Sequence, residues 1–433
     1  MTQPSPAGPA AARSGHRTTA VLVLLAATTF AAVTTEMLPV GLLPSISAGL
    51  GASESKVGLL VSGYAAVVAV GSIPMAALLE RLPRRPVLAA LMGTYALSNA
   101  VFAASGGYGL ALAARLVSGL AHAAFFAVVV SAAVALVPRP RAGRAVAMVM
   151  SGTAVALAVG VPAGTALGTA LGWRWVFAGS AAGLLLLAVA VGRVLPDTPA
   201  APAAAPRAPE RQTVIGALGQ PRLLLIAAVI ALLMLGQFTA YTYVSPLLMH
   251  AGVTREGVSA VLLGYGGAGL AGLALAGSVA DRSPRAGLRL TIGLLAACLA
   301  GLGLVHATLP TVFIAVVWGL AYGAVPTLTQ SGALAAVPAA PDAGPAVVNA
   351  MSNVGIAGGA LIGARELAAG PVSVLAVTGA ALAAAALVLH VSPLPRGRQR
   401  DAGRRRLRGG TSDGAAVASS GSRDGGFTSS SRR

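Results

Sequence analysis

Charged residues are scarce in this 433-residue chain, which has 30 basic and 12 acidic side chains, or 10% of its residues. A soluble domain usually has about a quarter of its residues charged, so the composition excludes an ordinary water-soluble enzyme. Hydrophobic residues make up 56% of the chain and the mean hydropathy is +0.80. Together these values favour a multi-span membrane protein.

Cysteine and catalytic motifs are also lacking. The single cysteine, Cys298, excludes a disulfide framework and a cysteine-based metal site. The sequence has no phosphate-binding loop of the GK[ST] type and no His/Asp/Glu cluster with metal-ligand spacing. We therefore predict neither an enzyme nor an ATP-driven pump, and we expect no metal and no cofactor.

The net charge of +18 does not indicate a nucleic-acid-binding surface. Of the 30 basic residues, 29 are arginine, and ten lie after residue 395. The charge therefore belongs to a tail and to loops rather than to one folded face, and we expect no nucleic-acid partner.

Long apolar runs are abundant. A helix needs about 20 mainly apolar residues to cross the hydrocarbon core, and continuous runs of this length favour helices over the strands of a barrel. We predict an all-α integral membrane protein with twelve spans, at about 19–43, 57–79, 87–105, 109–137, 145–170, 175–195, 223–248, 258–280, 287–305, 310–337, 345–368 and 371–391.

Arginine placement predicts the orientation. With the N-terminus inside, the inner segments before the tail hold 15 basic residues and the outer loops hold 4. This asymmetry follows the positive-inside rule and places both termini in the cytoplasm. The first apolar run is too long for the apolar region of a signal peptide, so we expect it to remain as span 1.

The two halves of the chain repeat each other. Gly63-Tyr64 recurs as Gly264-Tyr265, and the acid–arginine pair Glu80-Arg81 recurs as Asp281-Arg282, both at an offset of 201 residues. Repeated six-span halves are one layout of secondary transporters, with the substrate site between the halves. The predicted parts are a cytoplasmic segment (1–18), an N-terminal six-helix bundle (19–195), a cytoplasmic linker (196–222), a C-terminal six-helix bundle (223–392) and a disordered basic cytoplasmic tail (393–433).

Several motifs carry a family resemblance. The pattern Ala76-x3-Glu80-Arg81-x2-Arg84-Arg85, with its copy Gly277-x3-Asp281-Arg282-x2-Arg285, resembles the loop signature of the major facilitator superfamily. Arg115-x3-Gly119 is similar to the span-4 arginine motif of that superfamily. The span-5 motif of its antiporters is resembled by Gly152, Gly160, Pro162, Gly164 and Gly168. Residues 35–44 and 241–246 look like the twelve-span drug and sugar efflux branch, which includes arabinose-efflux-like and chloramphenicol-efflux proteins.

The resemblance covers about residues 19–392 and implies two pseudo-symmetric six-helix bundles with the major facilitator fold. It implies export of a drug, sugar or related metabolite in exchange for protons, by alternating access, with the proton gradient as energy source. We expect a drug-resistance transporter of the plasma membrane, a monomer whose partners are a small-molecule substrate and the lipid bilayer. Proton-coupled uptake of a sugar or other nutrient by the same fold is the alternative; a membrane enzyme, receptor or channel is more remote.

Three polar residues inside spans are candidates for proton coupling or substrate contact: Glu36, Arg115 and His122. A charge at the membrane centre costs about 3 kcal/mol, so such a residue normally faces a cavity or a partner. Glu36 can carry a proton, whereas an arginine stays protonated and can only bind a substrate or tune an acid. The other interpretations are a wet, structural Glu36, an Arg115 bound to backbone carbonyls and a His122 that only packs.

The remaining candidates fall into three groups. The substrate cavity is predicted to include Phe125, Phe126, Gln237, Tyr241, Tyr243, Asn349 and Asn353, with packing as the alternative role. A conformational latch at the inner end is predicted from Glu80, Arg81, Arg84, Arg85, Asp281, Arg282 and Arg285, which otherwise set only the topology. A bending and packing segment in span 5 is predicted from Gly152, Gly160, Pro162, Gly164 and Gly168.

Overall fold

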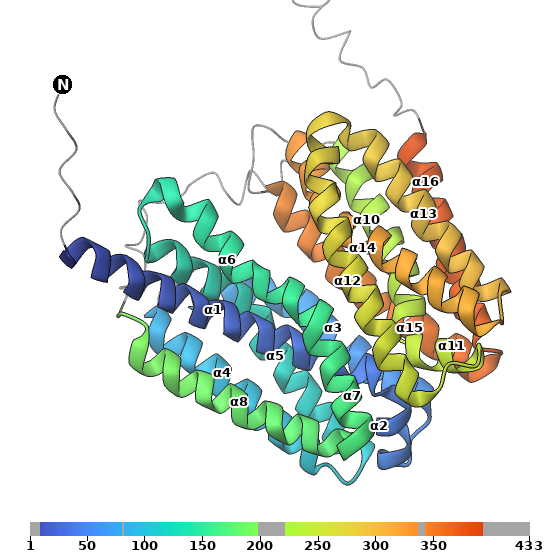
Figure 1. Cartoon of the computed structure of the whole chain (residues 1–433), viewed down its shortest axis with the longest axis horizontal. Helices are drawn as coiled ribbons and strands as arrows, with labels where there is room; N and C mark the ends of the chain where they lie inside the picture. Colours follow the sequence, from blue (N-terminus) through green and yellow to red (C-terminus); the bar gives the residue numbers. More distant parts are fainter. Residues whose placement is uncertain (1–8, 80–81, 198–220, 337–342, 393–433) are drawn as a thin grey trace, which may run out of the picture. The chain divides into compact units, whose positions relative to one another are not determined.

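The computed structural model describes residues 9–79, 82–197, 221–336 and 343–392, and its regular elements there are all helical (Figure 1). These residues form twelve helical segments long and apolar enough to cross a membrane. The prediction of an all-α protein with twelve spans is therefore confirmed. The predicted tail at 393–433 and most of the predicted linker lie outside the described residues.

The first six spans occupy residues 9–194. Their elements are α1 (Pro9–Gly41), α2 (Leu43–Leu50), α3 (Glu54–Leu79), α4 (Arg84–Ala104), α5 (Tyr108–Ala135), η1 (Arg139–Arg141), α6 (Ala142–Val155), η2 (Ala156–Gly160), α7 (Val161–Leu171) and α8 (Trp173–Val194). Within this group α4 packs on α5 and α8, α3 packs on α5, and α1 packs on α6 and α8.

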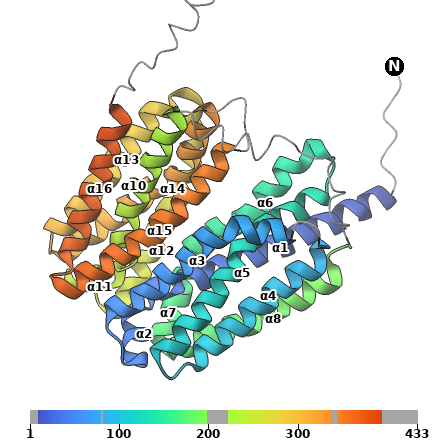
Figure 2. The same ribbon diagram turned by 180° about the vertical axis from the view of Figure 1, so that it is seen from behind.

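The last six spans occupy residues 221–391. Their elements are α10 (Pro221–Tyr241), α11 (Val244–His250), α12 (Arg255–Arg282), α13 (Pro284–Leu304), α14 (Thr308–Ala336), α15 (Ala343–Ala369) and α16 (Ser373–Val391). Here α12 packs on α14, α10 packs on α15 and α16, and α13 packs on α14 and α16 (Figure 2). The two groups meet where α3 contacts α15 and where α12 contacts η2 and α7.

The helices alternate in direction, which defines two ends of the bundle. We call the end with Pro221, Val194 and Val391 the terminal end, and the end with Gly51, Gly172 and Gly252 the loop end. Each of these three glycines has a positive φ, which lets the chain turn sharply between helices.

The repeat seen in the sequence also appears in the backbone. The first span breaks at Leu42 into α1 and the short α2, and the seventh span breaks after Tyr241 into α10 and the short α11. A positive-φ glycine follows each short helix: Gly51 directly after α2, and Gly252 after α11 and Ala251. The two glycines are 201 residues apart. The two halves therefore share an interrupted first helix.

The fifth span contains a π-helical turn, η2, between α6 and α7. Pro162 has no backbone N–H to donate to the carbonyl of Ala158, and the Val161 N–H bonds instead to the carbonyl of Ala156, five residues back. Added side chains at Gly152 and Gly164 would collide with α1, so these glycines allow the two spans to pack closely. The role of this segment as a bending point stays a prediction.

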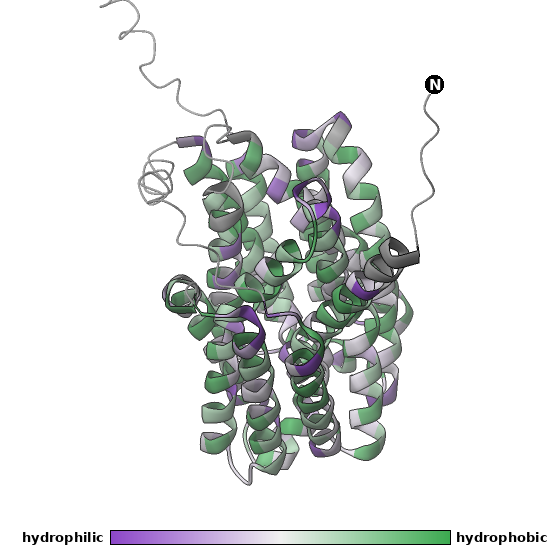
Figure 3. Ribbon diagram, turned by 90° about the vertical axis from the view of Figure 1, so that its left-hand side faces the viewer, coloured by the Kyte–Doolittle hydropathy of each residue, from purple (hydrophilic) through white to green (hydrophobic). Residues whose placement is uncertain are grey.

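Hydrophobic residues occur along most of the length of the helices (Figure 3). Many of them are exposed on the spans, such as Leu309 and Val70, at 82% and 79% exposure. The surface of a water-soluble protein carries many charged residues, whereas these apolar faces suit contact with lipid hydrocarbon. The twelve spans and their apolar faces define a multi-pass membrane protein.

Candidate functional site

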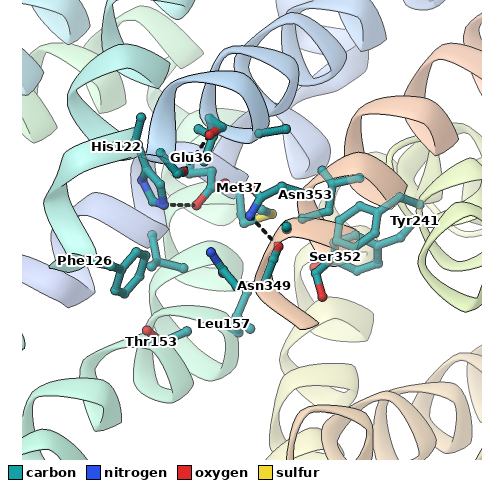
Figure 4. Close-up of a pocket in the computed structure, with 18 of the residues that line it drawn as sticks. Glu36, Met37, His122, Phe126, Thr153, Leu157, Tyr241, Asn349, Ser352 and Asn353 are labelled. Atoms are coloured by element: carbon teal, nitrogen blue, oxygen red, sulfur yellow. Dashed lines mark hydrogen bonds and ion pairs between the residues drawn. The ribbon is translucent and has the colours of Figure 1, made fainter. Parts of the chain in front are cut away.

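A cavity of about 560 Å³ lies among α1, α3, α5, α6 and η2 of the first half and α10, α12, α14 and α15 of the second (Figure 4). This volume suits a drug-sized compound. The polar residues of its lining are Glu36, Ser72, His122, Thr153, Tyr241, Tyr265, Tyr322, Asn349, Ser352 and Asn353.

Glu36 is paired with His122 across the cavity wall. The Glu36 Oε2 atom lies 3.6 Å from Nε2 of His122, and the two residues are 8% and 6% exposed. The other ring nitrogen of His122, Nδ1, is hydrogen-bonded to the Tyr95 hydroxyl at 2.7 Å. Tyr95 therefore fixes the imidazole so that Nε2 faces the carboxylate (Figure 4).

Arg115 is buried behind Glu36 and does not line the cavity. Its guanidinium donates hydrogen bonds to the carbonyl oxygens of Thr35 at 3.1 Å and Glu36 at 2.9 Å. Pro39 lacks the N–H that would bond to the Thr35 carbonyl in a regular helix, so Arg115 supplies the missing donor. The guanidinium also stacks over the Tyr64 ring, 4.4 Å from its centroid.

The second half contributes an aromatic wall, which we define as Phe238, Tyr241, Tyr265 and Tyr322. Tyr265 lies at its centre. Its ring is tilted by only 31° from Tyr241 and 28° from Tyr322, at centroid distances of 5.2 and 6.4 Å. The Tyr265 ring thus lies between two phenol rings, each inclined to it by about 30°, beside the cavity. Such a set of rings offers aromatic surface to a flat ligand.

Hydrogen bonds join the halves toward the loop end. Ser55 and Ser62 on α3 donate at 2.7 Å to the carbonyls of Ala364 and Ala357 on α15. Ser245 donates to the carbonyls of Val40 and Gly41, at the break in the first span. These contacts close the loop end in this conformation.

The structure brings together only some of the predicted site residues. Glu36, His122, Phe126, Tyr241, Asn349 and Asn353 line the cavity. Arg115, Phe125, Gln237 and Tyr243 are buried outside its lining. Tyr243 lies nearer the loop end, where its hydroxyl donates to the Ala360 carbonyl at 2.9 Å.

The residues predicted to form the latch lie at the terminal end. Arg85 pairs with Asp197 at 3.1 Å and donates to the Gly192 carbonyl, and Arg84 donates to the Leu79 carbonyl. Arg282 and Arg285 are exposed. Glu80, Arg81 and the side chain of Asp281 lie outside the described residues, so the latch stays a prediction.

Tyr265 and Tyr322 are the main cavity residues that the sequence reasoning missed. The internal repeat marks both residues, because Tyr265 belongs to the repeated Gly-Tyr pair and Tyr322 repeats the position of His122 at an offset of 200. Treating repeat positions in the second half as candidate cavity residues, like those in the first half, would have identified them. In the part of the chain that the structure describes, no group of three or more His, Cys, Asp or Glu is placed to hold a metal ion.

A twelve-span bundle with a cavity between two helical halves is the architecture of a secondary membrane transporter. Comparison with known protein families gives the same class of protein, because the family model of the Major Facilitator Superfamily matches residues 24–360. The chain belongs to this superfamily, and it is a membrane transporter rather than an enzyme.

Individual relatives support the same family. A chloramphenicol resistance protein of Streptomyces lividans is 36% identical over 264 residues, which are 61% of this chain and 67% of that protein. The inward-facing, unoccupied structure of a bacterial homolog of the human lysosomal transporter Spinster matches with a TM-score of 0.68 and 15% identity, over 87% of this chain and 95% of that one. A mutant form of the nucleoside transporter NupG matches with a TM-score of 0.71 and 12% identity, over 86% of this chain and 98% of that one.

Proposed function

We propose that this protein exports a small organic compound in exchange for protons by alternating access. The observation that carries the proposal is Glu36, a carboxyl that lines the central cavity within 3.6 Å of an imidazole. A carboxyl held in such a place can load and release a proton as its exposure changes. The first substrate we propose is chloramphenicol, because a 36% identical relative is a chloramphenicol resistance protein.

Glu36 is the proton carrier in this proposal. It takes up a proton from outside, and the protonated form favours opening toward the cytoplasm. Release of the proton there restores the carboxylate and prepares the cavity for substrate. His122 stabilises the carboxylate between these steps, because its Nε2 faces the carboxyl and its Nδ1 is held by Tyr95.

Arg115 acts through the backbone rather than on the substrate. Both of its terminal nitrogens are used by the carbonyls of Thr35 and Glu36. It therefore holds the helix in the conformation that presents Glu36 to the cavity.

The cavity suits a neutral or cationic compound with a flat apolar part. Its lining contains a carboxyl and an imidazole, while the buried Arg115 is already bonded to backbone oxygens. The aromatic wall and the amides of Asn349 and Asn353 offer stacking and hydrogen bonding on the opposite side. Figure 4 includes both sides of this lining.

The proposed location is the plasma membrane, with both termini in the cytoplasm. Eleven described arginines lie near the terminal end (Arg17, Arg84, Arg85, Arg139, Arg141, Arg144, Arg193, Arg222, Arg282, Arg285 and Arg289), against Lys56, Arg174, Arg255 and Arg365 near the loop end. In this orientation the closed loop end faces outward. The latch residues at the inner end would then pair across the halves in the outward-open state, in a protein that works as a monomer.

Transport by the purified protein in liposomes tests the proposal. A pH gradient imposed across the membrane should drive chloramphenicol uphill in the direction opposite to proton flow. Glu36→Gln should exchange substrate down its gradient but lose the response to pH, while Glu256→Gln, an exposed acid at the loop end, should behave as wild type. Substrate movement in the same direction as the protons would support nutrient uptake instead. Uphill transport by Glu36→Gln with unchanged pH dependence would overturn the assignment.

A further inference from the structure

Gln237 is a buried polar residue that no step of the proposed function uses. It lies on α10, is 0% exposed, and stands behind the aromatic wall rather than in the cavity lining. A buried amide is costly unless its donors and acceptors are satisfied. The hydrogen-bond partners of Gln237 therefore indicate what this residue does.

Both ends of the Gln237 amide hold an aromatic side chain. The indole Nε1 of Trp318 donates to Oε1 of Gln237 at 2.7 Å, and Nε2 of Gln237 donates to the Tyr265 hydroxyl at 3.0 Å. An indole N–H can only donate, so the amide oxygen must face Trp318 and the amide nitrogen must face Tyr265. The orientation of the amide is thus determined by its partners.

This arrangement fixes Tyr265 from two sides. Trp318, which is fully buried, packs its ring against Tyr265 at a centroid distance of 5.2 Å and an angle of 77°. Gln237 meanwhile holds the phenol oxygen as an acceptor. The structure thus holds Tyr265 both at its ring and at its hydroxyl.

The repeat adds an independent observation. Gln237 lies 201 residues after Glu36, the offset that also relates Tyr265 to Tyr64. The same position therefore carries an ionisable carboxyl in one half and an amide, which has no ionisable proton, in the other. An amide keeps the same donors and acceptor at every pH, so the hydrogen bonds that hold the aromatic wall do not depend on protonation at this position.

We propose that Gln237 is a positioning residue: it holds Tyr265 between the rings of Tyr241 and Tyr322 so that the wall binds the flat aromatic part of the substrate. This proposal rests on the proposed function, because it names the part of the transported compound that the second half recognises. In it, recognition of the ring belongs to the second half and proton coupling to the first.

Binding and transport of chloramphenicol by the full-length protein test the proposal. Gln237→Met keeps the shape of the side chain but loses both hydrogen bonds, and it should weaken binding and raise KM about tenfold, equivalent to about 1.4 kcal/mol. The kcat and the pH profile should stay those of the wild type. Tyr265→Phe should reproduce the weaker binding, because it removes only the hydroxyl that Gln237 holds.

Two further variants separate positioning from general damage. Gln237→Glu can still accept from Trp318 and bond to the Tyr265 hydroxyl, so its affinity should stay within about threefold of wild type. Thr329→Val removes a buried hydrogen bond from the same helix as Trp318, outside the cavity lining, and should leave KM unchanged. An equal loss in Thr329→Val, or wild-type affinity in Gln237→Met, would overturn the proposal.

Trp318 provides a readout that does not depend on transport. With Trp173 and Trp175 replaced by phenylalanine, Trp318 is the remaining tryptophan, and Gln237→Met should shift its emission by breaking the indole hydrogen bond. Absence of chloramphenicol binding by the wild type would refute this inference. Binding without pH-driven transport would refute the proposed function and leave the positioning role standing.

Discussion

Arg115 and Pro39 should be energetically coupled, although they lie on different helices. Pro39 leaves the Thr35 carbonyl without its helical donor, and Arg115 donates to that carbonyl at 3.1 Å. Replacing Pro39 with alanine restores the N–H, so Arg115 becomes less necessary there. Arg115→Met should therefore destabilise the protein less in the Pro39→Ala background than in the wild type.

The expected coupling is the cost of leaving one buried carbonyl unsatisfied, about 1–3 kcal/mol. The double-mutant cycle is needed because Arg115→Met also removes the cost of burying a charge, and this contribution cancels between the two backgrounds. Thr329→Val in place of Pro39→Ala serves as control, since Thr329 lies on α14 in the other half and bonds to carbonyls of its own helix.

Cys298 provides a built-in probe for the unfolding free energies of these variants. It is the chain's one cysteine and is buried, so a fluorogenic maleimide reports unfolding in a denaturant series without added labels. Effects that add within about 0.3–0.5 kcal/mol would show that the two sites are independent. The account of Arg115 as the donor for the Thr35 carbonyl would then be refuted.

Three further variants, one of them with a matched control, test packing and polar contacts. Gly319→Ala should cost about 2 kcal/mol of unfolding free energy, because its new methyl group would collide with the Tyr265 carbonyl, while the control Gly93→Ala meets open space and should be neutral. Ser62→Ala should weaken the closed loop end by about 1 kcal/mol and raise the labelling of a cysteine introduced at that end. Asp197→Ala breaks an exposed ion pair and should change stability in a melting experiment by less than about 0.5 kcal/mol.

Much of the fold could be predicted from the sequence, because span length and composition are imposed by the bilayer rather than by tertiary packing. The repeat likewise predicted paired halves, and Gly51 and Gly252 show that it extends to the turns. The residues that line the cavity were harder to predict than the spans. Phe125 and Phe126 are neighbours in sequence, yet only Phe126 lines the cavity, because which side of a helix faces the cavity depends on its rotation against its neighbours.

Arg115 illustrates the same limit. Its place inside an apolar span marked it as unusual, but the sequence offered substrate binding, proton tuning and backbone contact as explanations. Its carbonyl partners at residues 35 and 36 lie on another helix, about 80 residues earlier in the chain. Pro39 leaves the Thr35 carbonyl without a backbone donor, and only the packing of α5 on α1 shows that Arg115 donates to that carbonyl instead.

The distance between the two halves at the terminal end, measured at two pH values, would show whether Glu36 controls alternating access. Spin labels attached at Gly143→Cys and Ala286→Cys, both exposed sites, would report this distance by double electron–electron resonance in a Cys298→Ala background. Acidic pH should enrich the long distance in the otherwise wild-type protein, and Glu36→Gln should hold the long distance at both pH values. A pH response that persists in Glu36→Gln would contradict control of alternating access by Glu36.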